Sequence, residues 1–202
     1  MPHADAADDT TAFRLDCGAT WLNLLATQGR HPTPTPIERI PTPDRLAAWL
    51  ALHELTPAAP VTEDDVALAQ HLRRPIRAVA WATITGTPAP EEAVGELARF
   101  LREHDDPVAL LATDEGLRRA APDGTAAALS RIVRQAVDQL AGSERLTLKA
   151  CPEQDCLGLF SDPTGRRRWC PSPACASRGR VRALRARRAG IQSDDMTTSA
   201  PE

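Results

Sequence analysis

The chain has 202 residues and a mass of 21.8 kDa, which fits one domain of ordinary size with a small module attached and argues against a solenoid. Apolar residues make up 42% and charged residues 25%, as in ordinary globular proteins. We find no uncharged apolar run of about 18 residues that could cross a bilayer, so we expect a soluble protein. The first residues, Met1 to Asp5, are acidic and lead into no apolar segment, so we expect a cytoplasmic location without a secretory signal.

Positive charge is concentrated near the C-terminus. The basic residues are 23 Arg and one Lys, and nine of the Arg lie between Arg166 and Arg188, where there is no Asp or Glu. Because the formal net charge of the chain is −3, this +9 segment leaves −12 for the rest. A basic block on an acidic body is expected where one end of a protein meets a polyanion, although a solvated charged helix gives the same pattern.

The residues at 1–12 and 191–202 offer little to bury, and we expect both segments to be disordered tails. The first structure is expected within 16–28, as a short apolar helix. Prolines alternate with other residues at 31–36, and a residue before proline avoids the helical region. This segment is therefore expected to be an extended, polyproline-like connector.

Two helices with clear start signals should follow. Thr42 is a typical N-cap and Pro43 suits the first helical position, where a missing N–H costs nothing. Thr62 is followed by three acidic residues, which favour a helix N-terminus. Apolar spacing makes this second helix the longest expected one, with a kink at Pro75.

The rest of the body, 13–145, is expected to be mostly helical. A helix at 91–104 should turn Val94, Leu97 and Leu101 inward, and the segment 123–140 has helical apolar spacing throughout. The apolar positions of three tryptophans also indicate core, namely Trp21, Trp49 and Trp81.

A minor β component completes the expected fold, which is α+β and mostly α. Residues 107–111 and 116–119 can form a small hairpin, and 146–148 can form a short strand that leads into Cys151. A separate module is therefore expected over 146–190.

Four of the five cysteines form a pattern in this module. Cys151, Cys156, Cys170 and Cys175 are spaced as C-x4-C-x13-C-x4-C. Zinc needs four soft ligands in a tetrahedron, and two short-spaced cysteine pairs supply them. The remaining thiol, Cys17, is expected to be a partly buried bystander rather than a fifth ligand or a nucleophile.

The alternative is that these cysteines are free or disulfide-bonded in a loop-rich tail. A segment of about 40 residues with few apolar side chains cannot build an adequate core, and such segments usually need a metal or a bridge. Four thiolates would fill the coordination of one Zn²⁺ and leave no open position for an activated water. The pattern therefore predicts a single structural zinc.

Two parts of the sequence resemble known domains. Arg167-Arg168-Trp169-Cys170 and Cys175-Ala176-Ser177-Arg178, followed by a basic helix, resemble the CGNR-type zinc finger. Residues 21–145 resemble the ABATE domain that precedes this finger in its family, in Trp21–Thr27 and Glu38–Leu50. The resemblance implies a stress-induced transcription regulator whose finger binds zinc through its four cysteines.

The sequence departs from the family at the motif that gives the finger its name. Ala176 and Ser177 replace the family's Gly and Asn after the last cysteine, while Arg178 is kept. The zinc ligands survive this change, but any turn or contact that depends on the Gly and Asn does not.

A basic helix from about Ser172 to Ala189, closed by Gly190, would suit duplex DNA. On such a helix Arg178, Arg182 and Arg185 share a face, while Val181 and Leu184 should pack back on the metal loop. Arginine forks match phosphates and the guanine edge in the major groove. The predicted nucleic-acid contacts are Arg167, Arg168, Arg178, Arg180, Arg182, Arg185 and Arg187.

Other functions have weaker support in the sequence. Single-stranded nucleic acid needs exposed aromatic platforms, and the chain has no Tyr, three Phe and four Trp, of which Trp169 is expected to pack over the metal site. We find no phosphate loop, zinc-protease motif or nucleophile elbow, so we expect no enzyme. The alternative function is a zinc-stabilised protein-interaction module without DNA binding, whose arginines meet an acidic protein surface.

Overall fold

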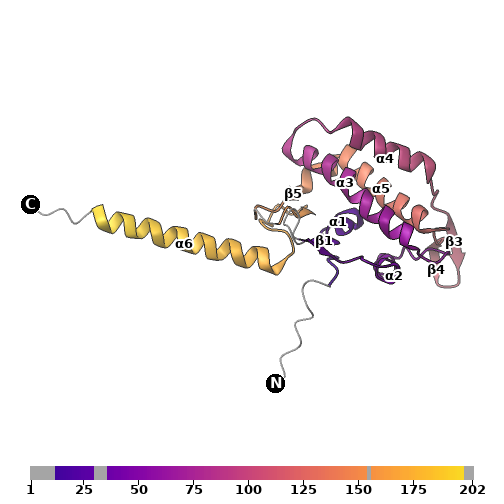
Figure 1. The fold of residues 1–202 in the computed structure, drawn as a ribbon, viewed down its shortest axis with the longest axis horizontal. Helices are drawn as coiled ribbons and strands as arrows, with labels where there is room; N and C mark the ends of the chain where they lie inside the picture. Colours follow the sequence, from indigo (N-terminus) through magenta and orange to yellow (C-terminus); the bar gives the residue numbers. More distant parts are fainter. Residues whose placement is uncertain (1–11, 30–35, 154–155, 198–202) are drawn as a thin grey trace, which may run out of the picture.

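The computed structural model describes residues 12–29, 36–153 and 156–197, and its elements fall into a helical body and a C-terminal finger (Figure 1). Most of the expected tail at 1–12 and most of the expected connector at 31–36 lie outside the described residues. The elements in chain order are α1 (Thr20–Leu25), β1 (Gln28–Gly29), β2 (Ile37–Glu38), α2 (Pro43–Ala51), α3 (Glu63–Thr85), α4 (Glu91–Glu103), β3 (Leu110–Thr113), β4 (Gly116–Arg119), α5 (Thr125–Ala141), the 3₁₀ helix η1 (Ser143–Thr147), β5 (Leu148–Ala150), β6 (Leu159–Ser161) and α6 (Pro173–Thr197).

The body is organised around α3, which packs against α1, α2, α4 and α5. Its core is built from the apolar faces of these helices, and Trp21 and Trp49 are fully buried there, as predicted. The indole N–H of Trp21 donates to Gln139 Oε1 at 2.7 Å, so this buried polar atom is paired. The structure thus confirms a mostly helical α+β fold.

The predicted helix starts are confirmed by their hydrogen bonds. The hydroxyl of Thr42 accepts a bond from the backbone N–H of Arg45. Thr62 and Asp65 form a reciprocal capping box at the start of α3, which continues through Pro75 to Thr85. With 23 residues α3 is the longest helix of the body, but α6 has 25, so the prediction that α3 would be the longest in the chain was wrong.

Two expectations about buried side chains were also wrong. The inward face of α4 is formed by Ala93, Leu97 and Phe100, while Val94 is 46% exposed. Trp81, near the end of α3, is 38% exposed rather than part of the core. Helical spacing identifies an apolar stripe, but the position of the neighbouring helices decides which edge of that stripe is covered.

The strands form three separate antiparallel pairs. The predicted hairpin is confirmed as β3 and β4, and all of its residues are exposed. The pair β1–β2 was not predicted, because each of its strands has only two residues. The third pair joins β5 to β6, with Leu148 opposite Ser161 and Ala150 opposite Leu159, and it carries the first two cysteines of the finger.

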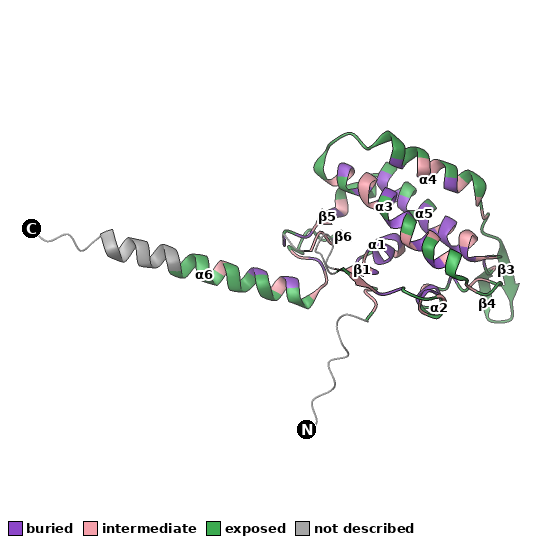
Figure 2. Cartoon of the chain, viewed as in Figure 1, coloured by how far each residue is buried: buried purple, intermediate pink, exposed green. Residues whose placement is uncertain are grey.

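Helix α6 projects away from the body, and most of its described side chains are exposed (Figures 1 and 2). It does not stop at Gly190, as expected, but continues to Thr197, which places a helix at the start of the expected tail at 191–202. A glycine inside a helix costs only about 1 kcal/mol relative to alanine, which neighbouring helix formers can offset.

None of the helices in the described part of the chain is both long and apolar enough to span a membrane. The cytoplasmic location stays a prediction.

A pair of substitutions on α4 tests which face is buried. Leu97→Ala should lower the free energy of unfolding by about 2–5 kcal/mol, because it removes buried methyl groups and leaves a cavity. Val94→Ala, one turn away on the exposed side, should change it by about 0.5 kcal/mol or less. Urea denaturation followed by circular dichroism measures both. Equal losses in the two variants would contradict the observed orientation of α4.

Candidate metal centre

The first cysteine pair lies on the turn of the β5–β6 hairpin. Cys151 follows β5 directly, and its backbone N–H donates to the carbonyl of Gly158 at 2.8 Å. The N–H of Cys156 donates to the carbonyl of Glu153 at 3.0 Å, which closes the loop between the two cysteines. A side chain at position 158 would begin 3.1 Å from Cys156 Sγ, so glycine leaves room for the sulfurs. These bonds turn both thiols toward the same point.

The second cysteine pair begins α6. Cys170 precedes the helix and Cys175 lies in its first turn, where its N–H donates to the carbonyl of Ser172 at 3.1 Å. Pro173 occupies the first helical position, as the sequence predicted. One pair of thiols is therefore supplied by a hairpin and the other by a helix start.

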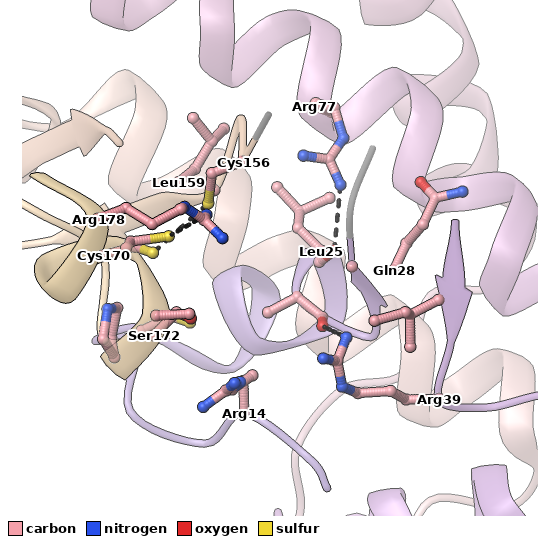
Figure 3. Close-up of a pocket in the computed structure, with 18 residues that line it drawn as sticks. Arg14, Leu25, Gln28, Arg39, Arg77, Cys156, Leu159, Cys170, Ser172 and Arg178 are labelled. Carbon is pink, nitrogen blue, oxygen red and sulfur yellow. Dashed lines mark hydrogen bonds between the residues drawn. The ribbon is translucent and has the colours of Figure 1, made fainter. Parts of the chain in front are cut away.

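The four sulfurs of Cys151, Cys156, Cys170 and Cys175 lie within 4.8 Å of one another. Cys156 Sγ and Cys170 Sγ are 3.6 Å apart (Figure 3). Sulfurs bound tetrahedrally at a Zn–S distance of about 2.3 Å are about 3.8 Å apart, so the cluster fits one zinc ion. All five cysteines are free, which removes the disulfide alternative.

The chemistry of the cluster also favours a cation. Without one, hydrogen bonds from Cys156 and Cys170 lower the pKa of Cys151. The contact with Cys151 in turn raises the pKa of both partners. Four thiols this close cannot all ionise unless a positive charge lies among them. A bound Zn²⁺ supplies that charge and holds the two cysteine pairs together, with no coordination position left for catalysis.

Cys17 lies outside the cluster, as predicted. It is buried in the body, and burial raises the pKa of its thiol to about 12. Its carbonyl accepts the N–H of Ser161 at 2.8 Å, which joins the loop before α1 to β6 of the finger. Gly18 is needed at this junction, since it has a φ of +99° and an added Cβ would lie 2.9 Å from the Cβ of Ser161.

A turn after β6 is held by the buried carboxylate of Asp162. It accepts bonds of 2.7 Å from Lys149 Nζ, Thr164 Oγ1 and the backbone N–H of Arg167. The ion pair with Lys149, together with these bonds, holds the pKa of Asp162 well below its usual range. The single lysine of the chain therefore helps to shape the segment between the cysteine pairs.

A second buried carboxylate, Glu153, fixes the direction of α6. Its side chain is 1% exposed and lies in the loop between Cys151 and Cys156. Arg182 Nη2 donates to its Oε2 at 2.7 Å, and Arg178 Nε lies 3.8 Å from the same atom. The indole N–H of Trp169 donates to Oε1 at 3.2 Å. Glu153 thus joins the first cysteine loop, the segment before Cys170 and two turns of α6.

Trp169 packs on α6, close to where the sequence predicted it. Its ring lies so close to Gly179 that a Cβ there would be 2.3 Å from Nε1 and 2.5 Å from Cε2. Neither Glu153 nor Gly179 was identified from the sequence. The sequence does contain one indication of the role of Glu153. It is one of two acids between the first two cysteines, and the same module has nine arginines, which need acidic partners.

The predicted DNA contacts fall into two groups. Four of these arginines have partners inside the protein: Arg178 and Arg182 contact Glu153, Arg167 Nη1 donates to the carbonyl of Asp16 at 3.1 Å, and Arg168 lies over the Trp169 ring. Within the described residues, no hydrogen bond or ion pair engages the exposed side chains of Arg180, Arg185 and Arg187.

The faces of α6 explain this division. Arg178 and Arg182 are four residues apart and share the face toward Glu153, with Arg185 a turn further along. Arg180 and Arg187 are seven residues apart, so they share the opposite face. Val181 and Leu184 were expected to pack on the metal loop, but they are 45% and 46% exposed.

The helical body and the four-cysteine finger define a two-part protein, and family models match both parts. Residues 18–143 match the ABATE family, described as "Putative stress-induced transcription regulator". Residues 147–188 match the CGNR zinc finger. A comparison with curated proteins finds no match.

The chain belongs to the ABATE family and carries a zinc-binding CGNR finger at 147–188. This order confirms the resemblance seen in the sequence, and the finger with its four clustered cysteines fits one structural zinc. Ala176 and Ser177 replace the Gly and Asn of the motif and lie in α6, just after Cys175. The helix therefore forms here without the motif's Gly and Asn.

Zinc content and its dependence on pH test the metal centre. We expect one Zn²⁺ per chain at neutral pH, and metal should be released as the pH falls because protons compete for the thiolates. Cys156→Ser should remove most of the bound zinc and unfold the finger. Cys17→Ser is the matched control and should keep the full zinc content. Elemental analysis of the dialysed proteins measures this, and zinc retained by Cys156→Ser would contradict the assignment.

Two glycine substitutions test the packing of Trp169 on α6. Gly179→Ala should lower the stability of the finger and shift the Trp fluorescence, since the new methyl group would displace the ring. Gly95→Ala is the control, because a Cβ on this exposed position of α4 meets nothing within 4 Å. It should stabilise the body by roughly 1 kcal/mol through helix propensity alone. A stabilising Gly179→Ala would show that the contact is absent in solution.

Proposed function

We propose that this protein is a non-enzymatic transcription regulator that docks α6 on duplex DNA. The observation that carries this proposal is the projecting helix α6, whose residues 173–188 include six arginines and no acid. An α-helix fits the major groove, and arginine forks bind phosphates and guanine. The regulatory role and its link to stress come from the description of the family.

The contacts of α6 refine which arginines would meet the DNA. Arg178 and Arg182 are held by Glu153, so their role is to orient the helix. The face away from Glu153 carries Arg180 and Arg187, and Arg188 lies beside them. These exposed side chains are available for phosphates. The proposed division is therefore an anchored inner face and a DNA-binding outer face.

The alternative is a protein-interaction module, which one observation favours. Val181 and Leu184 lie half exposed on the same helix, and DNA phosphates would not cover them. A partner with a negatively charged surface and an apolar strip would fit both the arginines and these two side chains. The two functions predict different results when duplex DNA is added to the protein, because only the first requires α6 to bind it.

Salt-dependent DNA binding tests the proposal. If Arg180, Arg187 and Arg188 each contact one phosphate, the slope of log K against log salt should be roughly −3. Changing Arg180, Arg187 and Arg188 to Gln should reduce the magnitude of that slope by about 3. Fluorescence anisotropy with a short duplex, in the presence of excess acidic protein, measures both quantities.

The matched control changes three arginines of the body to Gln: Arg99, Arg102 and Arg119. It removes the same charge from exposed positions away from the finger, and we expect its salt slope to equal that of the unaltered protein. Equal losses in the two variants, or binding without salt dependence, would contradict docking by α6. If excess acidic protein displaces the duplex from this protein, the result would favour the interaction module.

A further inference from the structure

The hairpin of β3 and β4 exposes an apolar surface at the end of the molecule opposite to α6 (Figures 1 and 2). Every residue of both strands is exposed. Four large apolar side chains lie in or next to the hairpin, and their exposed fractions are 46% for Val108, 67% for Leu110, 50% for Leu111 and 75% for Leu117. Single exposed leucines are ordinary, whereas a group of this kind marks an interaction site.

The hairpin is held in place at both of its ends. At its base, Arg131 of α5 donates through Nη1 to the carbonyl of Ala120 at 2.9 Å and forms an ion pair with Asp106. At its tip, the hydroxyl of Thr113 donates to the carbonyl of Gly116 at 2.7 Å. The strands are therefore presented in a fixed shape, which lowers the entropic cost of pairing with a further strand.

The backbone hydrogen bonds show which groups of β3 remain available. The N–H of Ala120 donates to the carbonyl of Ala109 at 2.8 Å, which makes these two a hydrogen-bonded pair. In an antiparallel ladder such pairs alternate, so Leu111 also bonds to β4. The N–H and C=O groups of Leu110 and Ala112 then point to the outer edge of β3, where no described strand pairs with them.

The two edges of the hairpin differ in charge. The strand β3 has the sequence Leu-Leu-Ala-Thr, with no charged residue and no proline to protect its edge. The strand β4 contains Arg118 and Arg119. Pairing of β4 with its own copy would set like charges opposite each other, which is destabilising, whereas pairing of β3 with its own copy opposes only neutral side chains. The unprotected edge is thus self-complementary.

We propose that β3 pairs with β3 of a second copy of this chain, antiparallel and about a two-fold axis, to give a dimer with a four-stranded sheet. In the register that uses all the free groups, Leu110 of each copy exchanges both of its backbone bonds with Ala112 of the other. Leu111 then lies opposite Leu111 of the second copy at the axis. A two-fold contact closes on itself, so pairing stops at two copies.

This register also covers the exposed leucines. Side chains of directly opposite residues share a face, so Leu117 and Ala112 of one copy and Leu110 of the other form one continuous apolar row. The second row is its symmetry copy, and the two Leu111 side chains meet on the other face. The area buried in total is on the order of 800 Å², below that of permanent dimers, so the dimer should dissociate in the micromolar range.

The dimer does not depend on DNA binding by α6. Because the hairpin and α6 lie at opposite ends of the molecule, pairing leaves both α6 helices and both metal centres uncovered. Loss of DNA binding would therefore leave the dimer intact, and loss of the dimer would leave a single chain able to contact DNA.

Analytical ultracentrifugation of the zinc-loaded full chain, without DNA, tests the proposal. We expect a reversible monomer–dimer equilibrium over about 1 to 200 μM, with the sedimentation of a monomer at the low end and of a dimer at the high end. A chain that stays monomeric throughout this range, or that assembles beyond a dimer, would overturn the proposal.

Three variants locate the interface. Leu111→Lys should weaken dimerisation about tenfold or more, because it sets two lysines opposite each other at the axis. Ala112→Pro should have a similar effect, since it removes an N–H that points to the free edge and leaves the bonds within the hairpin unchanged. Leu146→Lys is the matched control, because Leu146 is 81% exposed on η1, outside the hairpin, and this variant should dimerise as the unaltered protein does. Unchanged dimerisation in either hairpin variant, or its loss in Leu146→Lys, would refute pairing through β3.

Discussion

The finger depends on four sulfurs that converge on one point. Zinc joins a hairpin turn to the start of a helix, and neither element has enough apolar surface to form a core alone. The buried carboxylate of Glu153 lies in the loop that two of these cysteines close, so its bonds to Arg182 and Trp169 require that loop to be formed. The direction of α6 is in this way a consequence of the metal centre.

The sequence was sufficient where the physical signal is local. The caps at Thr42 and Thr62 and the hairpin at β3–β4 are each encoded within a few neighbouring residues, as is each of the two cysteine pairs. It was insufficient where the outcome depends on distant packing. Val94 and Trp81 have the same helical spacing as buried residues, and only the placement of other helices leaves them exposed. Glu153 and Arg178 are 25 positions apart, and no spacing rule pairs them.

The same distinction applies to the arginines. As a block the nine arginines at 166–188 indicate a polyanion, but the structure gives individual arginines, including Arg77 outside the block, different surroundings. Arg178 and Arg182 hold the helix, and Arg180 and Arg187 face outward. Arg77, from the body, lines a cavity between the two parts (Figure 3). A uniform count of positive charge would treat these side chains as equivalent, whereas burial and partners give each group a different energetic role.

Because α6 is long, a small change in its tilt near the zinc site produces a large displacement of its far end. Twenty-five residues at 1.5 Å per residue give a helix about 37 Å long. Its described anchors to Glu153, which are Arg178 and Arg182, lie in its first half. A tilt of about 5° at the zinc end would carry the far tip through roughly 3 Å, which is close to one base-pair step of a duplex. A sub-ångström shift of the atoms beside the cysteines would therefore change where the far end of α6 lies along a bound duplex.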